Sequence, residues 1–430
     1  MEFRRIVIVT ICLSVMLSLS GCKQETKNYS VYKEDYQSSY KTNVTFWQHC
    51  QSDGEGQYIN HNGYLYYHNE KNGTFAPVCQ KVNCLHDREF DKEKRKECNA
   101  CMKYHYVFDQ NGDIVFNDCD LIQYYDGYIY YAVGNCMYRT KKDGSEKDCV
   151  LKRPDRKEIQ RFLLHRGYLY YQIDCTMQDG NETYDNVKVY QVEVSAHMKE
   201  EDAQMLFDYE KTKNECISFL CFTARNQYIF WTAHVMKRGE ILEDDDYITK
   251  AWYEDYMYDT KTGEIKLINI PKEYRKPSVG FHQVIPVKQG VLVSLGDGFH
   301  DKTYKMPIFI MDYKTGKMKL WKKSEEQGRT MLSYKNYIII ENAFMAYKKG
   351  KKYADCEVYD ISGKKLADYE CPTFGEWDLE GFGPDGIQII PEYKKKTITL
   401  YEVKFQDVLK MHGKRINLKK IGVTPYFEGE

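Results

Sequence analysis

The sequence contains little proline, almost no net charge and, after its N-terminal segment, no long apolar run. Its 430 residues include only 10 prolines, and 62 basic residues nearly balance 63 acidic ones, giving a formal net charge of −1. This balance provides no basic surface for a phosphate backbone, so we expect no nucleic-acid partner. No later apolar stretch approaches the roughly 18 residues that a membrane-spanning helix needs. Long amphipathic helical patterns are also missing, which argues against a helical solenoid.

The common catalytic signatures are missing as well. We find no G-x-S-x-G nucleophile elbow, no phosphate-binding P-loop, no H-E-x-x-H motif and no G-x-G-x-x-G after a strand. These absences favour a binding or interaction module, with an extracellular protein, peptide or glycan as ligand, over an enzyme. The alternative function is that of an extracellular hydrolase or lyase acting on a glycan or a cell-wall-derived substrate.

The N-terminus combines two basic residues, a short apolar run and a cysteine. Arg4 and Arg5 precede the apolar residues 6–19, which are too few to span a hydrocarbon core of ~30 Å comfortably. The run ends in L-S-G-C at residues 19–22, which resembles the lipobox of lipoproteins cleaved by signal peptidase II. The resemblance implies cleavage between Gly21 and Cys22 and a diacylglyceryl group on the Cys22 thiol.

These signals predict where the chain resides. Membrane lipid bound through Cys22 is one expected partner, and the expected location is the outer face of the cell membrane. We expect residues 1–21 to form a signal peptide, the polar residues 22–45 a lipid-anchored tether, and residues 46–430 one folded domain. An ordinary signal peptide and an uncleaved anchor are the alternatives.

A repeated phrase predicts the fold of that domain. A short turn with Gly or Asn is followed by alternating aromatic and β-branched residues, a strand pattern that also accounts for most of the 39 tyrosines. The seven copies start at Gly63, Gly127, Gly167, Asn226, Gly290, Asn336 and Gly386. Their spacing, 40 to 64 residues, is close to the ~40–50 residues of a four-stranded propeller blade plus insertions. The sequence therefore predicts an all-β, seven-bladed β-propeller; six blades or a two-domain β-sandwich are the alternatives.

A second phrase supports this interpretation. A strand ends in Asp and is followed by a tight turn with Gly, as in residues 258–264, 312–317, 359–364 and 142–145. Asp can hydrogen-bond its own backbone and Gly tolerates positive φ, so each phrase predicts a hairpin.

The segment 77–103 concentrates potential soft metal ligands. Its spacing is C-x4-C-x-H, eleven residues, then C-x2-C, at Cys79, Cys84, His86, Cys98 and Cys101. Three of the cysteines with the histidine, or all four cysteines, could hold a structural zinc ion. Disulfides would fix the same insertion outside the cytoplasm, and free thiols are the third possibility.

The first repeat and this segment together resemble those of cell-surface lipoproteins of clostridia-type Gram-positive bacteria. Those chains share a lipobox, a C-x4-C-x-H…C-N-A segment and Tyr-rich propeller-like repeats. The resemblance is close over residues 63–101 and implies location and fold, without an activity.

One further phrase is a weak candidate for ligand binding. Asp297, His300 and Asp301 lie in a glycine-containing segment that could face the propeller channel. A plain turn is the simpler interpretation.

Overall fold

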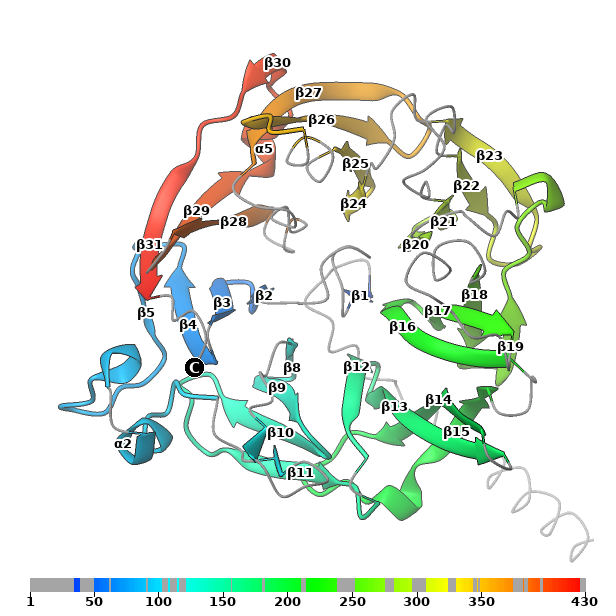
Figure 1. Ribbon diagram of the computed structural model, residues 1–430. Coiled ribbons are helices and arrows are strands. Elements are labelled where there is room, and N and C mark those ends of the chain that lie inside the picture. Colours follow the sequence, from blue (N-terminus) through cyan, green and yellow to red (C-terminus); the bar gives the residue numbers. More distant parts are fainter. Residues whose placement is uncertain are drawn as a thin grey trace, which may run out of the picture.

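The computed structural model places seven sheets in a ring around a central axis (Figure 1). The residues that it describes are 35–38, 50–61, 63–89, 92–102, 107–108, 114–115, 121–155, 157–179, 182–209, 214–237, 252–274, 282–295, 307–323, 330–342, 346, 349–373, 382, 386–394 and 397–425. The seven-bladed propeller predicted from the repeats is confirmed, and the six-bladed and sandwich alternatives are wrong.

The first four blades contain antiparallel strands in chain order from the axis outward. Blade 1 consists of β2 (Cys50–Ser52), β3 (Gly56–His61), β4 (Tyr64–Asn69) and β5 (Phe75–Pro77). Blade 2 consists of β8 (Ile122–Tyr125), β9 (Tyr128–Val133), β10 (Cys136–Lys141) and β11 (Asp148–Lys152). Blade 3 consists of β12 (Ile159–His165), β13 (Tyr168–Asp179), β14 (Glu182–Glu193) and β15 (Gln204–Asp208). Blade 4 consists of β16 (Asn214–Arg225), β17 (Tyr228–Lys237), β18 (Trp252–Asp259) and β19 (Glu264–Leu267), with β1 (Tyr36–Ser38) added beside β16.

The remaining blades complete the ring. Blade 5 consists of β20 (His282–Val287), β21 (Gly290–Leu295), β22 (Pro307–Met311) and β23 (Met318–Lys323). Blade 6 consists of β24 (Thr330–Tyr334), β25 (Tyr337–Glu341), β26 (Tyr353–Asp360), β27 (Lys365–Pro372) and the parallel β30 (His412–Arg415). Blade 7 contains β28 (Ile387–Lys394), β29 (Thr397–Lys404) and β31 (Lys419–Pro425).

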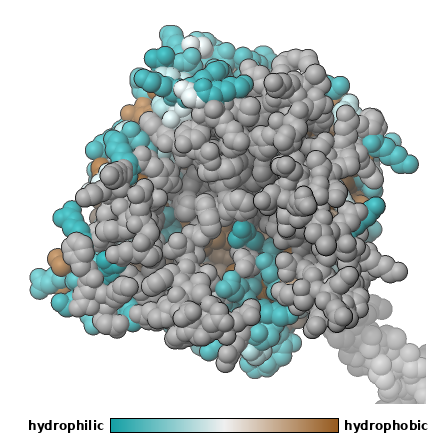
Figure 2. Space-filling view, viewed as in Figure 1, coloured by the Kyte–Doolittle hydropathy of each residue, from teal (hydrophilic) through white to brown (hydrophobic). Residues whose placement is uncertain are grey.

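Short elements lie outside the blades. They are the strand pair β6 (Val107–Phe108) and β7 (Ile114–Val115), the 3₁₀ helices η1 (His86–Arg88), η2 (Glu200–Asp202) and η4 (Lys272–Tyr274), and the α-helices α2 (Lys92–Lys96) and α5 (Phe405–Val408). Of the helices in the described part of the chain, none has the length and apolar character to cross a membrane. The described surface seen in Figure 2 is mostly hydrophilic.

The repeated phrase occupies the second strand of blades 2 to 6. Its turn works because Asp126 and Gly127 both have positive φ, 47° and 84°, which suits a tight hairpin between twisted strands. The copy at Gly63 instead begins the third strand of blade 1, and the copy at Gly386 begins the first described strand of blade 7. The blade count follows from the phrase, whereas the strand position differs in these two blades.

The second phrase forms the turn between the third and fourth strands, as its residues predict. In blade 5, Asp312 Oδ1 accepts hydrogen bonds from the backbone amides of Lys314 and Thr315 at 3.1 and 2.8 Å. Asp259 likewise accepts from the amide of Lys261 at 2.9 Å, and its carbonyl accepts from Gly263 at 2.8 Å. These short turns keep the outer hairpins in register.

The core lies between blades rather than inside any one of them. Apolar side chains of neighbouring blades form separate clusters: blades 2 and 3 share one around Phe162, blades 3 and 4 one around Trp231, and blades 4 and 5 one around Val293. Inner strands thus bury apolar residues on both faces, which explains the continuous burial of β21. Each blade is stabilised chiefly by its two neighbours.

The ring closes by contact between its first and last blades. His68 Nδ1 of β4 lies 3.8 Å from Glu402 Oε2 of β29, and both side chains are buried. Lys419 Nζ of β31 donates to the other Glu402 oxygen at 2.7 Å. Gly422 packs so closely on Phe75 of β5 that a Cβ atom there would lie 2.2 Å from the ring. One apolar cluster joins blades 7, 1 and 2 at the same place.

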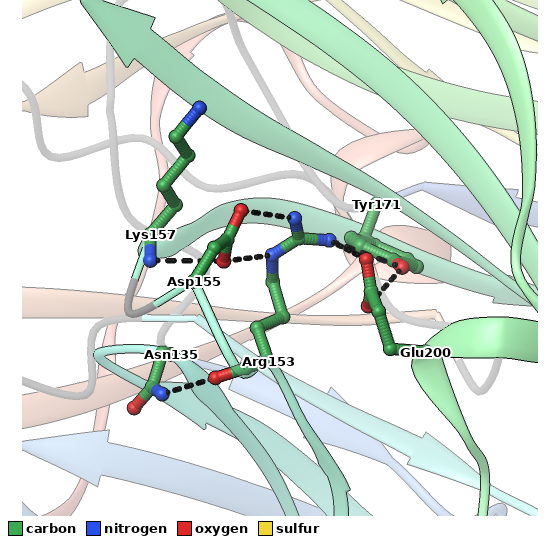
Figure 3. A network of polar contacts seen from close by, with 6 residues as sticks. All are labelled: Asn135, Arg153, Asp155, Lys157, Tyr171 and Glu200. Atoms are coloured by element: carbon green, nitrogen blue, oxygen red, sulfur yellow. Dashed lines mark hydrogen bonds and ion pairs between the residues drawn. The ribbon is translucent and has the colours of Figure 1, made fainter.

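Arg153, which follows β11, joins blade 2 to blade 3 (Figure 3). Its Nε and Nη2 atoms donate to the Asp155 carboxylate at 3.2 and 2.8 Å, and its Nη1 donates to Glu200 Oε1. Tyr171 of β13 donates its hydroxyl to Glu200 Oε2 at 3.1 Å. Asn135 donates to the Arg153 carbonyl at 2.6 Å. The Arg153 side chain is only 4% exposed, so its charge is neutralised by partners from two blades.

The N-terminal strand β1 lies inside the ring, beside the innermost strand of blade 4 (Figure 1). It pairs antiparallel with β16, with Tyr36 opposite Arg225 and Ser38 opposite Thr223. Just before it, Asp35 accepts a hydrogen bond from Arg166 Nε of blade 3 at 2.6 Å. Within the segment 22–45, residues 35–38 are therefore attached to the propeller.

Candidate metal centre and binding cleft

Four potential ligands meet in the insertion that follows blade 1. One ligand atom each from Cys79, Cys84, His86 and Cys98 lies within 4.8 Å of all the others, so the group could hold a metal ion. Cys79 follows β5, Cys84 and His86 flank the start of η1, and Cys98 follows α2. Cys98 Sγ lies 3.6 Å from His86 Nδ1.

The backbone of the insertion bends sharply to bring these residues together. Asn83 and His86 both have positive φ, 64° and 53°, a conformation that costs energy for residues with a Cβ. The amide of Cys84 donates to the Lys81 carbonyl at 3.4 Å, which closes the turn before the second ligand. Both residue types are among those that adopt positive φ most readily, so the sequence suits this bend.

The thiols differ in how easily they ionise. Burial alone would raise the pKa of Cys79, but hydrogen bonds from the backbone amides of Lys81 and Asn99 lower it below its usual range. Burial, followed by the hydrogen bond with Cys84, raises the pKa of Cys98 well above its usual range. A second thiolate is therefore unfavourable here without a cation, and a bound metal ion would supply that cation.

The donor set fits zinc. Three thiolates and one imidazole form a common structural zinc site, in which four protein ligands complete a tetrahedron. Ligand atoms that share one zinc ion lie about 3.3–3.8 Å apart, so the group needs only a small contraction. In the described structure the three cysteines of this group, and Cys101 beside them, are free thiols.

Cys101, the fifth sequence candidate, lies outside the group. Its backbone forms a bridge with Tyr64 of blade 1, and its carbonyl accepts a hydrogen bond from Lys147 of blade 2. Lys147 also donates to the Cys98 carbonyl at 3.1 Å. Cys101 therefore helps to attach the insertion to two blades.

The centre lies where the ring closes. Cys79 and Cys98 belong to the apolar cluster that joins blades 7, 1 and 2. The 3₁₀ helix that begins with His86 also contacts β31, the outer strand of blade 7. Gly144, in the β10–β11 turn, packs against Asn99 so closely that a Cβ atom would lie 2.6 Å from its carbonyl oxygen. A metal ion here would hold a segment that touches all three blades.

A cleft on blade 3 is the second feature of interest, and sequence reasoning did not identify it. It has a volume of about 600 Å³. Its walls come from β13, β14, β15 and the segment before η2: Tyr168, Gln191, Val192, Glu193, Val194, Ser195, His197, Met198, Lys199, Asp202 and Gln204. The Tyr168 side chain is 39% exposed although it begins a repeat strand. In the sequence, the one indication of this site is a tyrosine at the start of a repeat strand, and many other tyrosines in the repeats look the same.

Two amides shape one wall of the cleft. Gln191 Nε2 donates to Gln204 Oε1 at 2.8 Å, and the Tyr258 hydroxyl lies 3.4 Å from Gln191 Oε1. The other walls offer carboxylates, an imidazole and an ammonium group beside the Tyr168 ring. An aromatic face next to hydrogen-bonding groups suits a polar ligand.

The other residues singled out in the sequence lie outside the described part of the chain. These are Gly21 and Cys22 of the lipobox and the ligand-binding candidates Asp297, His300 and Asp301.

The sequence matches no protein-family model and no curated protein. Among solved structures, a prolyl endopeptidase aligns with a TM-score of 0.45 and 10% identity over 91% of this chain and 52% of its own. The acylaminoacyl peptidase of Pyrococcus horikoshii gives 0.44 and 10% over 86% and 54%. A eukaryotic initiation factor gives 0.42 and 12% over 93% and 92%. This chain thus spans about half the length of the two peptidases.

Proposed function

We propose that the protein is a lipid-anchored binding module on the outer face of the cell membrane. The lipobox ending in Cys22 supports the anchor. Asp35, which is attached to blade 3, is the thirteenth residue after Cys22, so an extended tether reaches at most about 45 Å. The propeller would therefore stay close to the membrane surface, where it meets ligands of the cell envelope.

The cleft on blade 3 is the observation that carries the binding function. Its volume of about 600 Å³ is within the range of small-molecule sites and suits a short glycan or the end of a peptide. The partly exposed Tyr168 ring would stack on a sugar or a peptide side chain. The Glu193 and Asp202 carboxylates would then accept hydrogen bonds from hydroxyl or amide groups, and the Gln204 amide would donate one.

A binding screen tests this function. The mature chain would be probed with glycans and muropeptides, and its best ligand titrated against Tyr168→Ala and Tyr128→Ala. Tyr128 begins the same repeat strand in blade 2 and does not line the cleft, so it is a matched control. We expect at least a tenfold loss of affinity for the first variant only. Equal affinities of the two variants for the ligand would mean that the binding site is not this cleft. Cleavage of the ligand would favour the hydrolase or lyase alternative.

We further propose that Cys79, Cys84, His86 and Cys98 hold a structural zinc ion. The Cys₃His donor set and the position of the group between three blades support it. Zinc would offset the cost of the positive-φ residues and fix the insertion against the ring closure.

Chelation separates zinc from disulfides. A chelator should remove the metal and make α2 (Lys92–Lys96) accessible to trypsin, whereas reductant alone should change nothing. Cys84→Ser should mimic the chelator, and Cys101→Ser should retain the metal because Cys101 lies outside the group. Cleavage that responds to reductant and ignores chelator would show that disulfides fix the segment.

A further inference from the structure

Blade 2 contains a second group of thiols, away from the metal centre. Cys136 begins β10 and Cys149 lies in β11, the outermost strand of the blade. Side chains alternate along a strand, so Cys136 and Tyr138 share one face of the sheet. Cys149 is paired with Tyr138 across the two strands and lies on that face too.

A β-bulge brings the two cysteines together. The register shifts between Met137, which is opposite Leu151, and Tyr138, which is opposite Cys149, so Val150 is the extra residue. Bulges bend the strand and increase its local twist. The bulge places the Cys136 and Cys149 thiols on one face as neighbours that influence each other's ionisation. Cys136 Sγ also lies 3.6 Å from Asn135 Oδ1, and Cys149 Sγ lies 3.5 Å from the Leu151 carbonyl oxygen.

The two sulfurs have different environments. The hydrogen bond from the Cys149 thiol, with smaller contributions from the Tyr138 hydroxyl and the Lys152 charge, lowers the pKa of Cys136 to about 6 against the effect of burial. The same hydrogen bond raises the pKa of Cys149 well above its usual range. At neutral pH, Cys136 is thus the thiolate and Cys149 carries the shared proton. Cys149 is exposed and Cys136 is buried beside it, so reagents reach the pair from the Cys149 side.

We propose that Cys136 and Cys149 form a redox-active dithiol that small-molecule disulfides convert reversibly into a cross-strand disulfide. The Cys136 thiolate attacks one sulfur of the oxidant, whose S–S bond breaks and releases one thiolate. The Cys149 thiol then loses its proton to that thiolate and attacks the Cys136 sulfur, which releases the second thiolate. Two electrons pass to the oxidant, which leaves as one thiol and one thiolate.

The position of the pair makes the disulfide reversible. Cys149 is exposed in the outermost strand of the blade, so a bond between the two sulfurs would stay accessible to reductant. Strained and exposed disulfides are the easily reduced, regulatory ones rather than permanent staples. Closing this bond would lock the outer hairpin of blade 2 at its bulge.

Thiol mapping of the full mature chain tests the proposal. The protein, with its metal centre loaded, is equilibrated in buffers of reduced and oxidised glutathione, and free thiols are alkylated before peptide mass analysis. We expect a linked peptide of Cys136 and Cys149 that disappears in reducing buffer. Cys149→Ala should instead accumulate glutathione on Cys136. Two free thiols in oxidising buffer, or a stable glutathione adduct on Cys136 of the unmodified chain, would overturn the proposal.

The rate of alkylation gives an independent readout. Cys136 should react with iodoacetamide with a midpoint near pH 6, and Cys149→Ala should move that midpoint upward by about one pH unit or more because the hydrogen bond is lost. Cys175, a buried thiol in blade 3, is the internal control and should stay unreactive while the chain is folded. A Cys136 midpoint near 9 in the unmodified chain would contradict the assigned thiolate.

Discussion

Replacing Arg153 with methionine should destabilise the propeller by about 3 kcal/mol at pH 7. The change removes the charge that faces Asp155 and Glu200 and keeps most of the apolar stem. Breaking a buried ion pair costs about 3–5 kcal/mol, and we expect the lower end because the two carboxylates are 37% and 22% exposed. The loss should be smaller when Glu200→Gln is already present, since only the more exposed Asp155 carboxylate then loses its partner.

The pH dependence of this variant provides a sharper check. Burial raises the pKa of Glu200 above its usual 4.5 even with Arg153 opposing the shift. Without Arg153 that pKa must rise further. A carboxyl whose folded pKa is raised contributes stability below its unfolded pKa and loses it as the pH rises through the folded pKa. The Arg153→Met variant should therefore be less impaired near pH 4.5 than at pH 7.

Urea unfolding followed by tryptophan fluorescence measures both effects. The single variants and the Arg153→Met/Glu200→Gln double variant form a cycle, and we expect a coupling energy above about 1 kcal/mol. Lys199→Met is the control, because its pair with Glu201 is exposed and should contribute little. A wild-type unfolding midpoint for Arg153→Met, or an equal loss at both pH values, would refute the proposed interblade link.

Three further predictions concern the closure of the ring, the stability of the fold at acid pH and the lipid anchor. Gly422→Ala should cost about 1–3 kcal/mol in the same unfolding assay because its Cβ would meet the Phe75 ring, and Phe75→Leu should recover part of that loss. Burial would raise the pKa of Asp53, but the hydrogen bonds from Lys142 and two backbone amides lower it below 3.8. The ionised Asp53 therefore stabilises the fold above that pH, and this contribution is lost as the pH falls through the folded pKa. Asp53→Asn should make the free energy of unfolding depend less on pH in this acid range. Cys22→Ala should leave an unprocessed precursor or release the protein from its lipid anchor. A variant that still partitions into detergent like the wild type and is cleaved at the same place would disprove lipidation.

The number of blades could be predicted from the sequence because the inner hairpin repeats with its turn chemistry. Gly127 and Gly167 each provide the positive φ that the turn requires, and the following Tyr residues alternate between neighbouring blades. The position of each copy within its blade could not be predicted for Gly63, since the same turn also suits the next hairpin of blade 1. Local turn chemistry determines that two strands pair, not which pair in the blade they form.

Long-range pairings left no local signal. The β1 residues 36–38 show no apolar pattern, and their partner β16 lies far away in the sequence. The bond between Arg166 and Asp35 depends on the same approach. The parallel addition of β30 to blade 6 also escaped prediction, because its residues are exposed and carry no apolar pattern.

The metal centre could be predicted only in part. Spacing identified five ligand candidates, and a ligand set of three cysteines and a histidine was one of two left open. The exclusion of Cys101 depends on its bridge with Tyr64, a contact made by the blade rather than by the insertion. The contact between the insertion and β31 joins residues from opposite ends of the chain, so the position of the centre at the ring closure was hidden as well.

Metal analysis of the purified mature chain tests most directly whether this centre binds zinc and stabilises the closure of the ring. Zinc content and the unfolding midpoint would be measured on the same sample before and after chelation, with Cys84→Ser and Cys101→Ser in parallel. We predict one zinc ion per chain, lost together with a clear drop of the midpoint on chelation and in Cys84→Ser, and retained in Cys101→Ser. A metal-free chain in which Cys79, Cys84 and Cys98 take part in disulfides, with a midpoint that ignores chelator, would contradict the account.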